Sequence, residues 1–198
     1  MEETDFLAEL RQRTGVSHRQ LEARVPFVRL TADDVAAVDV AHAFTLFHAF
    51  YAGLEPVLVS RLGMLSLAGL YRRRSHLLAD DLATLGYSLP QPWPSIVPDD
   101  EAGLLGLVYA IEGSALGGQI VARHLRSRLG AEFSDSLTFY SALTNGVGAH
   151  WQRVLAALRQ ALGREPALDA MSAAANGVFA SLISLAETCS SEPCLTLR

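Results

Sequence analysis

The sequence predicts an all-α protein that folds as a single-domain bundle of seven or eight helices. Apolar residues recur every three or four positions almost throughout the 198 residues, which is the spacing of an amphipathic helix. Convincing two-residue alternation, the pattern of a half-buried strand, is absent from the sequence. Half of the residues are hydrophobic, so the chain can bury a substantial core. We assign residues 1–188 to the helical domain and 189–198 to a polar C-terminal tail.

Proline and glycine mark the expected ends of the helices. The first helix begins near Thr4 or Asp5, either of which could cap it, and ends at about Arg24, before Pro26. Pro56 is expected to separate the second helix from a short third one. Residues 86–98 contain four of the eight prolines and are expected to form a loop. The other predicted helices are 32–53, 55–63, 67–85, 99–129, 134–162 with a bend at Gly146 and Gly148, and 166–187.

Charge and composition exclude several classes of protein. The 16 basic residues are all arginine and 21 residues are acidic, whereas a general nucleic-acid-binding surface needs a basic excess. No uncharged run reaches 18 residues, so we expect no membrane span. The first residues lack the basic start and apolar stretch of a secretory signal, which predicts a cytoplasmic protein. Cys189 and Cys194 are therefore expected to be reduced thiols.

The first helix carries His18 on its apolar side. A buried imidazole must have its ring nitrogens satisfied by a hydrogen bond or by a metal, so a structural core histidine and a metal ligand both remain open. Arg11 precedes His18 by seven residues and returns to nearly the same side of the helix. That spacing would suit a flat, iron-centred ligand with carboxylate arms. The apolar stripe comprises Leu7, Leu10, Thr14, His18, Leu21 and Val25.

A long apolar helix in the middle of the chain is weakened by glycines. Gly113, Gly117 and Gly118 lie inside it, and each interior glycine costs about 1 kcal/mol relative to alanine. The bare strip that they form suits either tight helix packing or a flat ligand lying against a helix that bends there. Ser114 is a polar group beside the strip, and Glu112 is interpreted as a structural acceptor rather than a catalytic base.

The remaining charged and imidazole groups are interpreted as structural or solvent-exposed. Arg72–Arg74 is expected to be a solvated face of the helix at 67–85, because a run of like charges usually faces water. The other histidines are expected at the surface or in structural contacts: His42, His48, His76, His124 and His150.

Two segments resemble the signature helices of the haem oxygenase family. LRQRTGVSHRQLE, at 10–22, resembles its proximal helix, with a threonine four residues before the histidine and a glutamate four residues after it. YAIEGSALGGQIVARHL, at 109–125, resembles its distal helix, whose glycine-rich segment kinks over the haem. FYSALTNGVGAHWQRVLAAL and ANGVFASL resemble its C-terminal helices, so the resemblance covers most of the chain. The ALGG form is closest to bacterial members, including those that supply biliverdin to bacterial phytochromes.

The resemblance implies a reaction and a set of site residues. Haem would be both substrate and cofactor, cleaved with O2 to biliverdin, carbon monoxide and ferrous iron, and His18 would be the axial iron ligand. Gly113, Gly117 and Gly118 would lie against the distal haem face. Ser114 stands where animal members have an aspartate that orders water for proton delivery, so the proton relay would rest on ordered water, on Ser114 or on a residue from another helix. The haem-binding residues that the resemblance adds are Arg11 and Arg153 at the propionates, Thr14, and Tyr109 near a family tyrosine.

The implied reaction needs partners, and it has rivals. Because the chain has no nicotinamide or flavin motif, electrons would come from an external ferredoxin or reductase, and a bacteriophytochrome could receive the biliverdin. One rival is a non-catalytic haem-binding or haem-carrier protein on the same fold. A second is another enzyme on a similar bundle, although the chain has no Glu-x-x-His motif for a di-iron site and no cysteine outside its tail. A third is a helical interaction module without a ligand.

Overall fold

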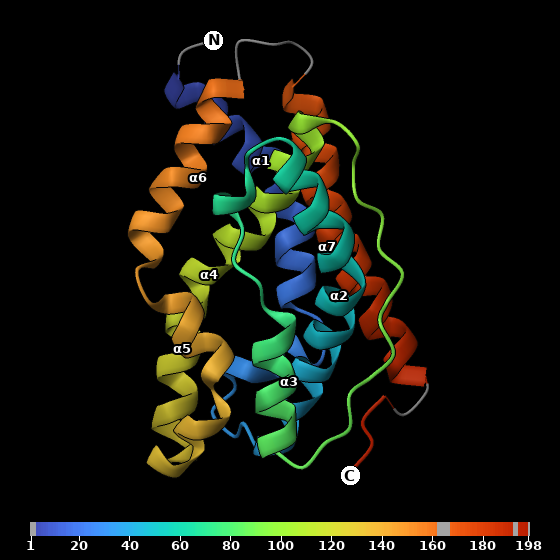
Figure 1. The fold of residues 1–198 in the computed structure, drawn as a ribbon. Coiled ribbons are helices and arrows are strands. Elements are labelled where there is room, and N and C mark those ends of the chain that lie inside the picture. Colours follow the sequence, from blue (N-terminus) through green and yellow to red (C-terminus); the bar gives the residue numbers. More distant parts are fainter. Residues whose placement is uncertain (1–2, 162–166, 192–193, 198) are drawn as a thin grey trace.

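The computed structural model describes residues 3–161, 167–191 and 194–197. This part of the chain is all-α, as the sequence predicts, and its β pairing is confined to one isolated bridge between Tyr87 and Leu197. Three short 3-10 helices accompany seven α-helices, which pack side by side as a bundle (Figure 1). The α-helices are α1 (Glu3–Glu22), α2 (Ala37–Met64), α3 (Ser75–Thr84), α4 (Glu101–Leu129), α5 (Thr138–Thr144), α6 (Val147–Ala161) and α7 (Ala167–Ser191).

The packing of α4 on α7 forms the centre of the bundle. α1 also packs against α7, while α5 and α6 pack against α4 (Figure 1). At the crossing of α4 and α7, Gly106 lies directly against the backbone of Met171, because a residue without Cβ lets two helices approach closely. Leu104, Val108 and Met171 are fully buried around this contact. The glycine near the start of α4 is therefore a packing residue.

The predicted helix break at Pro56 is wrong. α2 continues through Pro56 from Ala37 to Met64, and Pro56 is exposed on its outer side. A proline inside a helix removes one backbone hydrogen bond and crowds the preceding turn. Leu54, Leu58 and Leu62 lie on the inner side and are at most 1% exposed. Burial of leucines before and after Pro56 keeps the two halves of the helix in line.

The predicted solvated helix face at Arg72–Arg74 is also wrong, except that Arg73 is exposed. These residues precede α3, which begins at Ser75, and Arg74 is fully buried. The backbone N–H of Arg72 donates to Glu112 at 3.0 Å, and that of Arg74 donates to Glu55 at 2.5 Å. Buried carboxylates therefore satisfy the backbone donors that a helix would have satisfied with its own carbonyls.

The segment predicted as one bent helix at 134–162 is divided into separate elements. A 3-10 helix at Ala131–Ser136 leads to α5, and Gly146, whose φ is +63°, separates α5 from α6. A positive φ favours glycine, so the chain reverses there instead of bending. Asp81 of α3 accepts the backbone N–H groups of Thr138 and Phe139 at 2.8 Å each. This carboxylate fixes the start of α5.

The proline-rich segment 86–98 is a loop, as predicted, and runs along the outside of the bundle from α3 to α4 (Figure 1). The backbone N–H of Trp93 donates to the carbonyl of Ala49 at 2.8 Å, and the Trp93 backbone lies against Gly53. At the start of the loop, the N–H of Ser88 donates to Thr196 at 2.8 Å. The loop is thus held by α2 and by the end of the chain.

The prediction of reduced cysteines is wrong, because Cys189 and Cys194 form a disulfide. α7 extends to Ser191, so Cys189 lies in its last turns, beyond the domain boundary assigned at 188. The Cα atoms of Cys189 and Cys194 lie 5.3 Å apart, within the range that a disulfide requires, and Leu197 pairs with Tyr87. Sequence spacing alone could not show this proximity.

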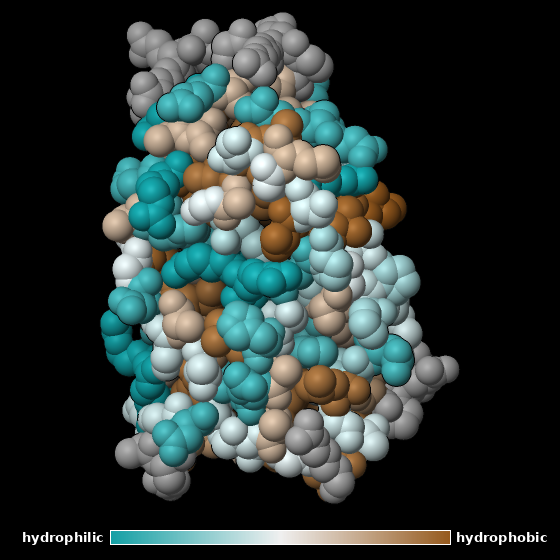
Figure 2. All heavy atoms as spheres, in the orientation of Figure 1, coloured by the Kyte–Doolittle hydropathy of each residue, from teal (hydrophilic) through white to brown (hydrophobic). Residues whose placement is uncertain are grey.

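Three helices, α2, α4 and α7, are long and apolar enough to cross a membrane by length and composition alone. In the bundle, much of their apolar surface instead packs on neighbouring helices, with Phe44, Leu105 and Leu182 among the buried side chains. On the face that Figure 2 shows, hydrophobic residues form separate patches between hydrophilic ones. Core packing therefore accounts for a large part of the hydrophobicity of these helices.

The close approach at Gly106 predicts a large effect of a single methyl group. Gly106→Ala should lower the free energy of unfolding by about 1–3 kcal/mol, because the new Cβ would collide with the backbone at Met171. Gly63→Ala in α2 is the control, since nothing lies within 4 Å of its Cβ position. Urea unfolding of both variants checks the prediction; equal stabilities for the two would contradict it.

Candidate functional site

The candidate site is a cavity of about 500 Å³ between helices that come from distant parts of the chain. α1 and α7 contribute one part of its lining, and α4 and α5 contribute another. The 3-10 helix Phe27–Thr31 and α2 complete it with Phe27, Leu30, Phe47 and Tyr51. The lining is mainly apolar, and the volume lies in the range of pockets that bind small molecules and cofactors.

His18 lines this cavity. Its place in the apolar stripe predicted that it would lie in the packed core, but it does not. Its side chain is 42% exposed, and Nδ1 lies 3.5 Å from the carboxylate of Glu22, one helical turn later. Phe179 of α7 contacts the imidazole edge-on, with ring centroids 5.3 Å apart. A carboxylate on the Nδ1 side leaves Nε2 as the nitrogen available to a metal. The stripe holds for Leu10 and Thr14, which are buried, and ends before Val25, which is exposed.

The glycine strip of α4 lines the same cavity, and α4 is helical throughout its length. A Cβ at Gly113 would meet the Trp151 ring at 3.4 Å, and one at Gly118 would meet the Tyr140 ring at the same distance. A methyl group at either position would therefore make ordinary van der Waals contact with an aromatic ring, so both glycines lie beside packed rings. Nothing lies within 4 Å of a Cβ at Gly117, so this position faces open space. Gly117 is the part of the strip that stays bare.

The hydroxyl groups at the cavity differ in availability. Ser114 lines the cavity, but its hydroxyl donates to the carbonyl of Ile111 at 2.7 Å. Tyr51 and Tyr140 also line the cavity, and sequence reasoning missed both. Burial raises the pKa of Tyr51 to about 12 and raises that of Tyr140 as well, so both phenols stay protonated at neutral pH. Apolar periodicity places them in the core but does not distinguish a cavity wall from solid packing.

Four other predicted haem-binding residues do not line the cavity. Arg11 is exposed on α1, and the hydroxyl of Thr14 donates to the carbonyl of Leu10 at 2.8 Å. Tyr109 packs against Trp151, with ring centroids 5.7 Å apart. Arg153 donates to Nδ1 of His150 at 3.0 Å. Of the predicted site residues, the structure thus brings together His18, Gly113, Ser114, Gly117 and Gly118.

Comparison with known proteins found one relative and no matching family model. A protein named heme oxygenase from Xanthomonas campestris pv. campestris (strain 8004) is 37% identical to the chain over 137 residues. The matched region covers 67% of this chain and 79% of that relative. The chain belongs to the haem oxygenase family. Haem is thereby implied as its substrate, and the all-α bundle is the fold that the resemblance predicted.

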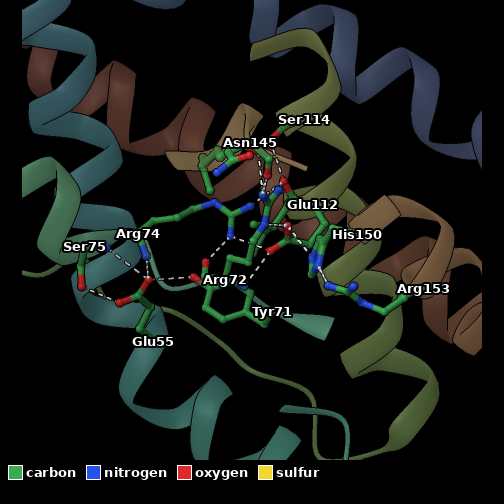
Figure 3. A network of polar contacts seen from close by, with 12 residues as sticks. Glu55, Tyr71, Arg72, Arg74, Ser75, Glu112, Ser114, Asn145, His150 and Arg153 are labelled. Atoms are coloured by element: carbon green, nitrogen blue, oxygen red, sulfur yellow. Dashed lines mark hydrogen bonds and ion pairs between the residues drawn. The ribbon is translucent and has the colours of Figure 1, made fainter. Parts of the chain in front are cut away.

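Beside the cavity, this haem oxygenase family member contains a buried network of charged groups (Figure 3). Glu112 lies at the centre of the network, and its side chain is fully buried. Its hydrogen bonds fit the interpretation of Glu112 as a structural acceptor. Glu112 accepts hydrogen bonds from Nη1 of Arg74 at 2.8 Å and from Nε of Arg72 at 3.2 Å. Burial raises the pKa of Glu112, but the two guanidinium groups outweigh burial and hold its pKa below the ordinary value. The carboxylate therefore stays ionised.

A second carboxylate and an imidazole extend the network. Glu55 of α2 accepts from the Tyr71 hydroxyl at 2.9 Å and from the Ser75 hydroxyl at 2.5 Å. On the other side of Glu112, Nε2 of His150 lies 3.1 Å from its carboxylate (Figure 3). Because Arg153 can only donate, Nδ1 of His150 is the acceptor, and the ring proton is on Nε2. Arg74 therefore joins α2 to α4 through Glu55 and Glu112, and the imidazole of α6 lies beside Glu112.

Titration of His150 should couple stability to pH. Burial lowers the pKa of His150 below its ordinary value, and burial also lowers that of His48. The unfolded chain then binds more protons than the folded chain below about pH 6.5, so the free energy of unfolding should fall on acidification. His150→Gln should reduce this slope by at most about 1.4 kcal/mol per pH unit, the value for one proton. Urea unfolding of the wild type and the variant between pH 8 and 5.5 checks the prediction. The same dependence of the free energy of unfolding on pH in both proteins would contradict it.

Proposed function

We propose that this chain is a biliverdin-producing haem oxygenase, in which His18 holds the iron and the Gly113–Gly118 segment lies against the other haem face. The observation that carries the proposal is that both groups line one apolar cavity of about 500 Å³, although they belong to helices far apart in the sequence. An apolar cavity of this size with one imidazole suits a flat, mostly hydrophobic macrocycle. Family membership supports the same reaction.

The residues around His18 fit an axial ligand. Glu22 lies on the Nδ1 side and would hold the tautomer with Nε2 free, and Phe179 restricts the ring from the α7 side. A neutral imidazole, unlike a thiolate, does not push electron density towards O–O cleavage. Bound haem would supply the iron that activates O2 and the carbon that is oxidised, and the products would be biliverdin, carbon monoxide and ferrous iron.

The other lining residues exclude water and retain hydrogen-bond donors. Phe47, Phe139 and Leu143 would keep the macrocycle dry. The phenols of Tyr51 and Tyr140, two lining residues, stay protonated and so retain a hydroxyl donor. The hydroxyl of Ser114 is engaged by the carbonyl of Ile111 in its own helix. We retain Arg11 as the propionate contact on α1, two turns before His18.

The proposed reaction needs electrons that the chain does not supply. We propose an external ferredoxin or reductase as donor, a cytoplasmic location, and membership of the bacterial type. On that interpretation the biliverdin could pass to a bacteriophytochrome. The ALGG sequence of the distal segment supports the bacterial assignment.

A haem carrier on the same fold is the second candidate. The engaged hydroxyl of Ser114 favours it, because the position that carries an acid in animal members here holds a hydroxyl that donates to Ile111. Turnover separates the two functions, because a carrier holds a stable Soret band whereas an oxygenase converts it to bilin absorption.

Hemin titration tests the proposal. The wild type should give a histidine-ligated Soret spectrum, and ascorbate or a ferredoxin system should convert the haem to biliverdin. His18→Ala should lose or displace that Soret band, because it removes the axial nitrogen. His76→Ala, an exposed histidine outside this cavity, is the control and should match the wild type. A wild-type Soret spectrum in His18→Ala would contradict the assignment of His18 as the iron ligand.

Gly117 gives a second test, in which stability and haem binding should move in opposite directions. Gly117→Ala should stabilise the haem-free protein by up to about 1 kcal/mol, because alanine favours the helix and its Cβ meets nothing. The same methyl group should weaken hemin binding, because it projects from the bare part of the strip. Thermal unfolding and hemin titration check both effects; unchanged hemin affinity would contradict contact at Gly117.

A further inference from the structure

We propose that Arg72 is a positioning residue that holds two walls of the cavity, α4 and α5, at a fixed spacing and so determines how the haem is seated. This inference rests on the proposed function as far as haem is concerned. Arg72 does not line the cavity itself, so it would act through the residues that do.

The contacts of Arg72 reach both walls. Its backbone N–H donates to Oε1 of Glu112 at 3.0 Å, and its Nε lies 3.2 Å from Oε2. Glu112 belongs to α4 and stands between two residues that line the cavity, Ile111 and Gly113. In the opposite direction, Nη1 of Arg72 donates to the carbonyl of Leu143 at 2.6 Å and approaches that of Asn145 at 3.4 Å. Leu143 also lines the cavity, so one guanidinium joins the two walls (Figure 3).

The rest of the α5 wall makes this link important. α5 has only seven residues, a length at which a helix depends on tertiary contacts. Asp81 fixes its start, and Arg72 binds the carbonyls at its end. Arg126 of α4 adds a contact to the Ser141 hydroxyl at 2.8 Å, but that contact is exposed. Arg72 is thus the partly buried link at the end of α5 that precedes Gly146.

The chemistry of the link requires arginine. A guanidinium presents several donors in a rigid plane and can bind a carboxylate and a carbonyl at the same time, whereas an ammonium is a single point of charge. Arg74 also binds Glu112, so the carboxylate keeps one charged partner when Arg72 is replaced. Replacement of Arg72 should therefore release α5 from α4 without leaving Glu112 unpaired.

The experiment compares Arg72→Gln and Arg72→Lys with Arg61→Gln. Arg61 is a matched control: its side chain is 25% exposed against 23% for Arg72, and it donates to the Pro98 carbonyl at 2.6 Å, outside the cavity lining. Hemin affinity is measured from the Soret band, and the seating of the haem from the methyl resonances of the cyanide-ligated ferric protein by proton NMR. Hydrogen exchange of residues 138–144 in the haem-free protein reports the α5 wall directly.

Both Arg72 variants should bind hemin about tenfold more weakly, show a second set of haem methyl resonances, and exchange α5 amides faster. Arg61→Gln should keep one resonance set and wild-type exchange in α5. If Arg72→Gln does not fold, the result for Arg72→Lys, which keeps a positive charge beside Glu112, decides whether the inference holds. Wild-type resonances and wild-type α5 exchange in a folded Arg72 variant would overturn the inference. If the wild type does not bind hemin, the proposed function fails, and the α5 exchange rates alone decide whether Arg72 holds the walls.

Discussion

The buried carboxylate of Glu112 is the constraint around which this bundle is arranged. A charge without solvent must be paired, and the closest available partners are guanidinium groups from the segment before α3. Satisfying Glu112 therefore brings Arg72 and Arg74 inside and leaves residues 71–74 without a helical conformation. The same requirement brings His150 of α6 to the other side of the carboxylate. One ionised group on α4 thus affects the course of two segments that are distant in sequence, residues 71–74 and α6.

The cavity depends on this arrangement because its walls come from elements that are not adjacent in sequence. α4 is fixed on one side by the charged network and on the other by the backbone contact of Gly106 with α7. α5 is attached at its start by Asp81 and at its end by Arg72. Rigid attachment of both helices lets an unfilled space persist between them, whereas loosely held helices would move together and close it. The polar contacts thus maintain an apolar space.

Local patterns in the sequence predicted most of the helices and five of the cavity residues, because periodicity and glycine content are properties of neighbouring positions. His18 and Gly117 belong to such patterns. The burial of Arg74 could not be predicted in this way, because a run of arginines is typical of a solvated face and its carboxylate partners lie 19 and 38 residues away. The disulfide and the continuity of α2 through Pro56 likewise depend on tertiary contacts. Long-range polar pairing is the information that the sequence patterns lack.

The position of α7 in the cavity has a consequence for the order in which the cavity can form. The ring of His18 belongs to α1, whereas Phe179, which contacts it edge-on, belongs to α7, far away in the sequence. Val178 and Leu182 of α7 also line the cavity. A chain in which α7 has not yet packed against α1 would present the imidazole on an incomplete wall. The cavity is therefore complete only once these two distant helices have come together.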